Sequence, residues 1–264
     1  MKASKLKLMT LAMATATLIG VTLDAQAHTR FRVPVIDENA ANHGSNYNDV
    51  VVAHGCQNTT DGASTIDTLG TVVVFPEKDA PIIKTRVAGS TGEYEIHDGV
   101  LTDFVANWGS PVTVIQDAGL FEFQEYIRDP LGNKIGFWSG GGRVLKAGFR
   151  GLLPIATAGV VINPESCAKS VTFVAAIADI CEITDPSGFS NGTLQLWTEA
   201  VGSVFDGEGL HGFNSPATLT VNRSIAALPE SCGDGLDVKV VPSAEQLNRD
   251  FNIKFQGQQI WPAQ

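Results

Sequence analysis

The run SVTFVAAIADI, residues 170–180, is the longest of a series of short segments rich in β-branched and aromatic residues. The other segments are Val50–Ala53, Thr71–Phe75, Pro81–Val87, Pro111–Ile115, Leu120–Ile127, Ile135–Trp138, Val144–Phe149, Gly159–Ile162, Thr193–Thr198 and Ala217–Asn222. Turn signals separate several of them: Asn-Gly at 191–192, Asp-Gly at 98–99 and 206–207, and three glycines at 140–142. Short strands at this spacing are typical of a sandwich. We therefore predict an all-β fold, an antiparallel β-sandwich.

Helical periodicity is weak by comparison. Thr102–Asn107 and Ser243–Asp250 could each form a turn or two of helix, the second with Ser243 as its N-cap. The last residues carry Cys232 and two strand-like runs, Val238–Val241 and Phe251–Phe255, but are too few to hold a core alone. We expect a C-terminal extension, residues 226–264, that forms an edge of a sandwich domain spanning residues 28–225.

Residues 1–27 have the features of a secretory signal sequence. A basic start precedes the apolar stretch Leu8–Leu23, and Ala25-Gln26-Ala27 supplies a small-x-small cleavage site. No later run is long enough to span a membrane. The prediction is a protein exported to the periplasm, the cell surface or the medium.

The charge balance sets two classes of partner aside. The whole chain has a net charge of −10, and removal of the signal sequence leaves 15 basic and 27 acidic side chains, a net charge of −12. A surface of this sign repels nucleic acid and anionic lipid. We therefore expect neither partner.

Cysteine and methionine usage restricts the possible metal chemistry. Cys56, Cys167, Cys181 and Cys232 all lie after the signal sequence, and in an oxidising compartment they imply two disulfides, with three pairings open. All three methionines lie within the signal sequence. A thioether-rich Cu(I) carrier is thereby excluded, and a site with a cysteine thiolate is disfavoured. Any copper would be bound by nitrogen and oxygen.

His28 is the first candidate ligand. Cleavage after Ala27 gives it a free α-amino group, which together with the imidazole can close a chelate ring around a metal ion. Amine and imidazole nitrogens suit copper above other divalent metals. The alternative is that a histidine follows the cleavage site by chance.

The other four histidines form no local metal motif. His43 and His97 lie in polar turns, where a solvated role is the simplest interpretation. His54 ends an apolar run two residues before Cys56, which favours a ligand or a packed, hydrogen-bonded role about equally. His211 lies in the glycine-rich loop 207–212, and such loops often carry function.

Several of these pieces occur in one order along the chain. They are His28, Ala53-His54-Gly55-Cys56, Val72–Glu77, Trp138-Ser139-Gly140-Gly141, Ile180-Cys181 and Leu196-Trp197-Thr198-Glu199. This order resembles the YcnI-like family of exported copper-binding proteins over about residues 28–200. The resemblance implies a sandwich of cupredoxin or immunoglobulin type, with copper on the N-terminal histidine and a tryptophan, here Trp197, packed near the metal.

Two further implications follow from the resemblance. The disulfides would be Cys56–Cys181 and Cys167–Cys232. The third ligand stays open, because this chain has His54-Gly55 where some members have a carboxylate; His54 or an acid such as Glu199 could replace it. In role, the chain is also loosely similar to surface copper-binding proteins of methane-oxidising bacteria, although their Trp-x-His spacing is absent.

The predicted function is copper acquisition, delivery or homeostasis without catalysis, with copper and a copper-handling protein as partners. The candidate metal ligands are His28, His54 and His211, with Trp197 beside the metal. Two other classes stay open. One is a copper oxygenase with an N-terminal histidine, although three tyrosines offer little material for an aromatic substrate platform. The other is a structural or adhesive sandwich that binds no metal.

Overall fold

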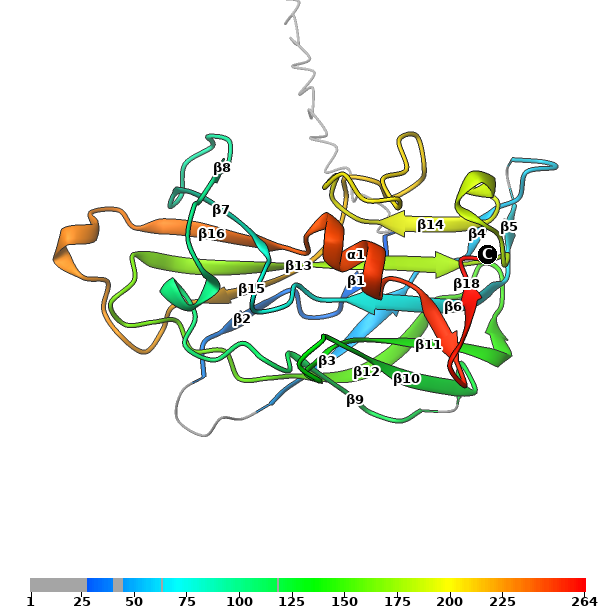
Figure 1. Cartoon of the computed structure of the whole chain (residues 1–264), viewed down its shortest axis with the longest axis horizontal. Coiled ribbons are helices and arrows are strands. Elements are labelled where there is room, and N and C mark those ends of the chain that lie inside the picture. The colour runs from blue at the N-terminus through cyan, green and yellow to red at the C-terminus, as the bar shows by residue number, and fades with distance from the viewer. Residues whose placement is uncertain (1–27, 40–44, 63, 118) are drawn as a thin grey trace, which may run out of the picture.

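A computed structural model describes residues 28–39, 45–62, 64–117 and 119–264, and the chain is all-β as predicted (Figure 1). The predicted signal sequence and His43 lie outside the described residues. None of the helices in the described ranges has the length and apolar character that crossing a bilayer requires.

Two sheets form a sandwich, and two small hairpins accompany them. The smaller sheet has the strand order β1 (Arg30–Phe31), β3 (Asn46–Val52), β12 (Gly151–Thr157) and β9 (Val112–Val114). The larger sheet runs β10 (Phe123–Arg128), β11 (Lys134–Leu145), β6 (Thr68–Val74), β13 (Ala168–Ile180), β16 (Leu236–Val241), β7 (Ile82–Val87) and β8 (Glu95–Ile96). It also holds β14 (Leu194–Trp197), β15 (Ala217–Asn222) and β2 (Val35–Asp37).

The hairpins pair β4 (Cys56–Gln57) with β5 (Thr65–Ile66), and β17 (Ile253–Phe255) with β18 (Gln258–Trp261). Helical structure in the described residues is limited to α1 (Ala244–Asp250) and the 3₁₀ turns Leu101–Asp103, Pro186–Gly188 and Glu230–Cys232. The first 3₁₀ turn overlaps the start of the weakly helical run predicted at 102–107. The prediction for α1 is confirmed, because the Ser243 side chain accepts a hydrogen bond from the Gln246 amide.

The longest strand, β13, organises the larger sheet and contains the run SVTFVAAIADI. Its first half pairs with β15 and, in parallel, with β16. Its second half pairs with β6 and β14. Since one strand has four partners, the two ends of the larger sheet are fixed relative to each other.

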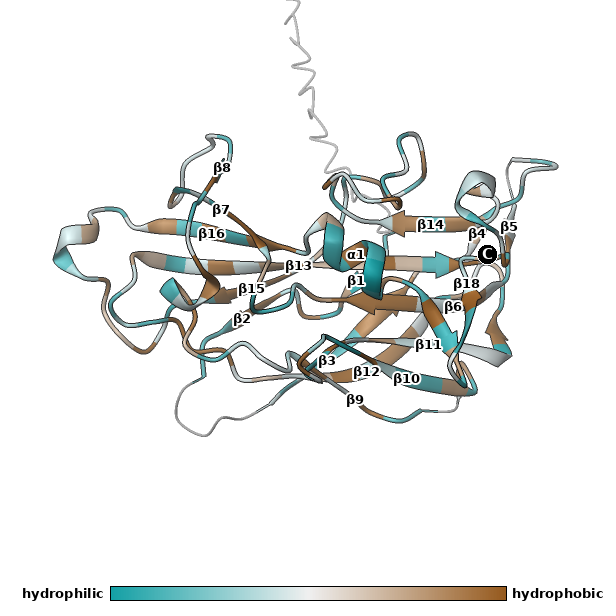
Figure 2. Ribbon diagram, viewed as in Figure 1, coloured by the Kyte–Doolittle hydropathy of each residue, from teal (hydrophilic) through white to brown (hydrophobic). Residues whose placement is uncertain are grey.

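Both faces of β13 are buried, in two separate cores. Phe173 and Ile177 face the smaller sheet and belong to the core between the two sheets. Ala176 and Ile180 face the opposite way and belong to a second core, to which the C-terminal segment contributes Leu247, Phe251 and Trp261. Figure 2 shows the hydrophobic strands lying beneath the more polar α1.

Both disulfides implied by the family resemblance are present. Cys56 is bonded to Cys181, and Cys167 to Cys232. The C-terminal segment differs from the expected edge position, because β16 lies between β13 and β7 inside the larger sheet. The reason is its apolar face: Val238 and Val240 are fully buried in the main core.

The three glycines at 140–142 are not a hairpin turn. They lie within β11, where the pairing register with β6 shifts between Gly140 and Leu145. Gly141 and Gly142 both have positive φ, 71° and 61°. Glycine accommodates such a backbone without steric cost, so the run forms a bulge rather than a chain reversal.

Candidate metal centre

Three of the residues nominated from the sequence lie together at the end of β14. Trp197 is the last residue of that strand, and His211 lies in the loop between β14 and β15. His28 lies two residues before the start of β1. The His28 ring lies 4.9 Å from the Trp197 ring, and the His211 ring lies 5.2 Å from it, centroid to centroid. The two histidine rings are 6.2 Å apart. The tryptophan is fully buried and both histidines are exposed, so the imidazoles form an open surface over a buried indole.

His211 is held in place by the residues on either side of it. Its carbonyl accepts a hydrogen bond from the Leu196 amide, and its own amide donates to the Asn191 side chain. The following residue, Gly212, has φ +92°, and a Cβ there would come within 2.5 Å of the Trp197 ring. Only glycine allows the backbone to approach the indole this closely.

His54 is positioned by the loop between β3 and the hairpin of β4. Its carbonyl accepts a hydrogen bond from the Gly148 amide. Gly55 has φ +96°, and a Cβ there would lie 2.0 Å from the Ile66 carbonyl oxygen. The Cys56–Cys181 disulfide then anchors the loop to the end of β13. This anchoring fixes the position of the half-buried His54.

One nitrogen of His54 is left without a partner. Its Nδ1 is buried and has no hydrogen-bond partner among the described residues. A buried polar nitrogen in this state costs free energy unless something binds it. An imidazole nitrogen is also a suitable ligand atom for copper and other transition metals. In this respect His54 fits a metal-binding role.

Electrostatics link the three histidines. Partial desolvation of the imidazole against its neighbours lowers the pKa of His211 below its ordinary value of 6.5, and the charges of His28 and His54 lower that pKa further. The neutral imidazole is therefore favoured at His211 near pH 7. This is the form with a free lone pair for a metal ion.

The side chains do not by themselves form a closed metal site. Among the described residues, no three His, Cys, Asp or Glu side chains meet with the spacing of a metal-binding cluster. The α-amino group that cleavage would create at His28 adds a further nitrogen beyond these side chains.

The alternative third ligand, Glu199, is occupied elsewhere. Its carboxylate forms ion pairs with Lys84 and, at 3.3 Å, with Lys239. Two lysines already balance its charge, which makes it a poor ligand. His97 is also separate from the site, since its ring packs 4.9 Å from Phe104.

Beneath the rings lies a carboxylate that sequence reasoning missed, Asp179. It is 1% exposed and accepts hydrogen bonds from Trp197 Nε1 at 2.8 Å, from Thr71 Oγ1 at 2.7 Å and from Thr29 Oγ1. Burial raises the pKa of Asp179, while the three donors and the nearby His54 act to lower it. A signal was available: Asp179 is the one charged residue in SVTFVAAIADI, in phase with the core residues Phe173 and Ile177.

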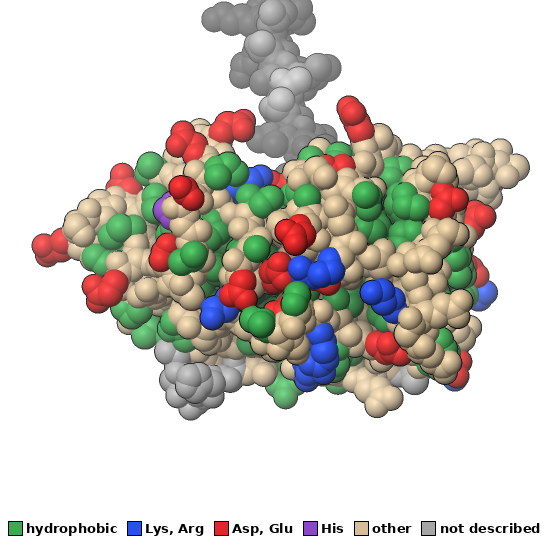
Figure 3. All heavy atoms as spheres, in the orientation of Figure 1, with side chains coloured by type: hydrophobic (Ala, Val, Ile, Leu, Met, Phe, Trp, Pro, Cys, Tyr) green, Lys and Arg blue, Asp and Glu red, His purple; other side chains and the backbone are tan. Residues whose placement is uncertain are grey.

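Charge on the surface is mixed. On the face drawn in Figure 3, acidic side chains spread from one end to the other and Lys and Arg side chains interrupt them. The described part of that face carries no continuous basic band.

Comparisons with known proteins identify no family. Neither known protein families nor curated proteins match the chain. Among solved structures, an uncharacterized protein from Nocardia farcinica, described as having an immunoglobulin-like fold, is similar at 14% identity and a TM-score of 0.33. The match covers 71% of this chain and 98% of that one. The likeness to the YcnI-like family stays a prediction.

Proposed function

We propose that the chain is an exported copper-binding protein that acquires or delivers copper through a site at His28, without catalysing a reaction. The observation that carries this proposal is the gathering of His28 and His211 on the buried Trp197 ring. These residues are far apart in the sequence, and each was nominated for copper independently of the fold.

In the proposed site, His28 contributes its ring and, after cleavage, its α-amino nitrogen. His211 and His54 supply further imidazole nitrogens. The unpartnered Nδ1 of His54 and the lowered pKa of His211 support this assignment, because both leave a nitrogen free for a cation. When bound, copper would be the cargo, and Trp197 would shield one side of it from water.

Export is part of the proposal. The two disulfides are typical of proteins that fold in an oxidising compartment. Together with the signal-like residues 1–27, they support a periplasmic or cell-surface location. A protein in that location would take copper from the surroundings or pass it to another copper-handling protein.

The test compares two forms of the chain, one beginning at His28 and one with a single alanine before His28. Copper(II) affinity is measured for both by competition with a chelator of known affinity. We expect the extended form to bind copper at least about 10-fold more weakly. Loss of a group that only supports a metal ligand typically costs about 10–100-fold, and here a ligand itself is lost. Equal affinities would contradict the N-terminal site.

A control separates the site from general copper adsorption. His97→Ala removes a histidine that packs on Phe104, away from the site, and should leave the affinity unchanged. His211→Ala removes a proposed ligand and should weaken binding. If both substitutions have the same effect, the binding is not at this site.

A further inference from the structure

The residue after His28 makes two connections that hold the N-terminal segment in place. Thr29 is 1% exposed, although it lies next to an exposed residue at the edge of the fold. Its hydroxyl donates a hydrogen bond to Asp179 and accepts one from the Ala53 amide at 2.9 Å. One hydroxyl group thus joins three parts of the chain: the segment that starts at His28, the residue before His54, and β13.

Asp179 extends this connection to the aromatic floor of the site. The oxygen Oδ2 that receives the Thr29 hydrogen bond also accepts from Trp197 Nε1. The other oxygen, Oδ1, accepts from Thr71 in β6. The Sγ of Cys56, two residues after His54, lies 3.8 Å from the Asp179 carbonyl oxygen, and its disulfide with Cys181 fixes it there. The segments that carry His28, His54 and Trp197 are therefore all connected to Asp179. The His211 loop is not, but the His211 ring packs on Trp197.

A carboxyl group at this buried position lowers the stability of the fold if its role is only to fill the core. Burying an acid away from water destabilises the fold unless hydrogen bonds or opposite charges compensate. Among the described residues, no lysine or arginine pairs with Asp179; its partners are two hydroxyls and an indole N–H. An apolar residue would fill the space at lower cost, but it could not hold Thr29 and Trp197 together.

We propose that Asp179 is a positioning residue for the histidine site. Acting through Thr29, Ala53 and Trp197, it fixes where His28 and His54 stand relative to the indole. This inference rests on the proposed function for its consequence in copper binding, but the fixed position of His28 is a property of the metal-free chain.

Two threonines on the same carboxylate provide a matched test. Thr29→Val and Thr71→Val each remove one hydroxyl, each preserve side-chain shape, and each delete one hydrogen bond to Asp179. Both residues are buried. Only Thr29 also connects to Ala53 and adjoins His28. Thr29→Val also leaves the Ala53 amide without its acceptor, so it should lose more thermal stability than Thr71→Val, and only Thr29→Val should affect the site.

The first measurement uses the metal-free chain beginning at His28. The ring protons of His28 lie against Trp197 and should show a ring-current shift in the NMR spectrum, with the His28→Ala variant giving the assignment. In Thr29→Val these shifts should move toward the values of a free histidine, whereas Thr71→Val should keep them. Unchanged shifts in Thr29→Val would overturn the proposal.

The second measurement is copper(II) affinity by chelator competition. We expect Thr29→Val to weaken binding about 10–100-fold, the usual loss when a group that orients a metal ligand is removed. Thr71→Val should stay within about threefold of the unsubstituted chain. Equal losses in the two variants would overturn the positioning role. If the unsubstituted chain itself does not bind copper, the proposed function fails, and the NMR shifts still decide whether the Thr29 hydroxyl, which connects His28 to Asp179 and Ala53, positions His28.

Discussion

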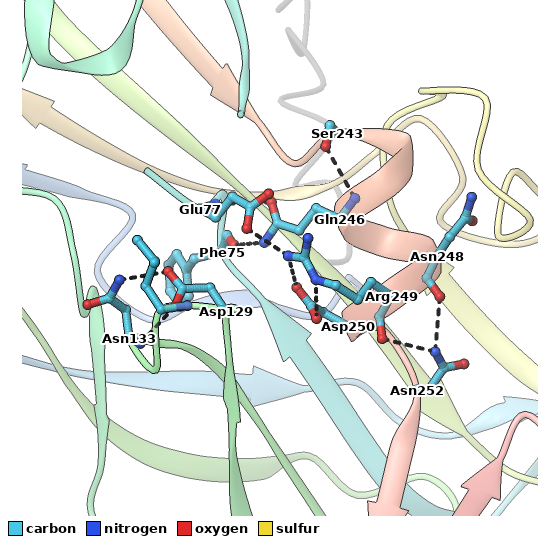
Figure 4. A network of polar contacts seen from close by, with 11 residues as sticks. Phe75, Glu77, Asp129, Asn133, Ser243, Gln246, Asn248, Arg249, Asp250 and Asn252 are labelled. Atoms are coloured by element: carbon cyan, nitrogen blue, oxygen red, sulfur yellow. Dashed lines mark hydrogen bonds and ion pairs between the residues drawn. The ribbon is translucent and has the colours of Figure 1, made fainter. Parts of the chain in front are cut away.

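Two regions of the molecule bury carboxylates, and they compensate the charge in opposite ways. Under α1, Arg249 donates to Glu77 at 2.6 Å and, through Nε, to Asp250 at 2.8 Å, so a built-in cation balances two acids (Figure 4). At the histidine end, Asp179 receives only neutral donors. In the folded chain, both acids of the α1 region already have a cationic partner, Arg249. The histidine end has a buried acid that no lysine or arginine of the described residues pairs with, and three hydrogen-bond donors without charge hold it.

The α1 region is further closed by amide hydrogen bonds. The Gln246 side chain accepts from the Glu77 amide at 3.0 Å and donates to the Phe75 carbonyl at 2.8 Å, as Figure 4 shows. These contacts tie the helix to the end of β6. The histidine end instead depends on a disulfide and on Asp179 for the same purpose. This difference predicts which substitutions destabilise the fold and which also affect the site.

The largest effect should come from the disulfide at the histidine end. Replacing Cys56 and Cys181 by serine opens a loop with a sequence separation of 125. By chain entropy this should cost about 4–5 kcal/mol, measured as the free energy of unfolding in urea. Copper affinity should fall as well, because the His54 loop is released.

The other disulfide is the control for that experiment. Replacing Cys167 and Cys232 by serine opens a separation of 65 and should cost about 4 kcal/mol, while copper affinity stays unchanged. Equal affinity losses for the two double variants would remove the distinction between the ends of the molecule.

A smaller loss should follow from Arg249→Met. The variant keeps the aliphatic packing but leaves Glu77 and Asp250 buried without their cation. Removing one partner of a buried ion pair costs 3–5 kcal/mol, and because Arg249 is 33% exposed we expect about 3 kcal/mol in urea unfolding. Copper affinity should not change. A loss below about 1 kcal/mol would show that water, not Arg249, compensates the two acids.

Asp179→Asn should lower the free energy of unfolding by about 1 kcal/mol, less than Arg249→Met. The asparagine side-chain oxygen can still accept from Thr29 and Trp197, and its NH₂ group can donate to the Thr71 hydroxyl.

The pH dependence of stability is the sharper measurement for Asp179. Burial raises the pKa of Asp179 in the folded chain above its ordinary value of 3.8. The folded state therefore retains a proton that the unfolded state has lost, and stability falls as pH rises through this window.

That pH-dependent fall should be present in the unsubstituted chain and absent in Asp179→Asn. Urea unfolding of both at several pH values upward from about 4 measures the difference. If the unsubstituted chain instead gains stability relative to the variant as pH rises, the three donors outweigh burial and Asp179 is a stabilised anion.

The smallest effect should come from His211→Gln in the metal-free chain. The pKa of His211 is lowered from 6.5, so the unfolded state takes up a proton first as the pH falls. The histidine's contribution is thus present above pH 6.5 and is lost below it. Because the side chain is exposed, the difference between the two proteins should change by less than about 0.5 kcal/mol across this range. A change of opposite sign would contradict the lowered pKa.

Strand-forming patterns predicted the fold class, and they located individual strands where the apolar pattern is continuous. The run at 170–180 became β13, and Ala217–Asn222 became β15 with the same bounds. β12, Gly151–Thr157, was missed because Gly151 and Pro154 interrupt its apolar pattern. Pairing with β3 and β9 stabilises that strand in spite of them. Tertiary contacts of this kind override local propensity.

Some residues of the candidate site could be nominated from the sequence, and others could not. His28 and Trp197 were nominated from the cleavage site and the family resemblance, and His211 from its loop; the fold places their rings together. Thr29 and Asp179 were missed, because a threonine next to a cleavage site and a lone acid in a strand have many ordinary roles. Their hydrogen bond spans 150 positions in the sequence. No local pattern can encode a contact of that range.

The sequence by itself determined the alternation that makes strands, the cysteines available for disulfides and the absence of methionine after residue 27. Each follows from side-chain chemistry that acts locally or by composition. Only the tertiary structure decided that the N-terminal segment, the His54 loop, β13 and the end of β14 meet at Asp179. That meeting depends on the pairing of β6, β13 and β14 and on a disulfide between distant residues. Strand register over such separations is set by how both cores pack, so the folded chain alone specifies it.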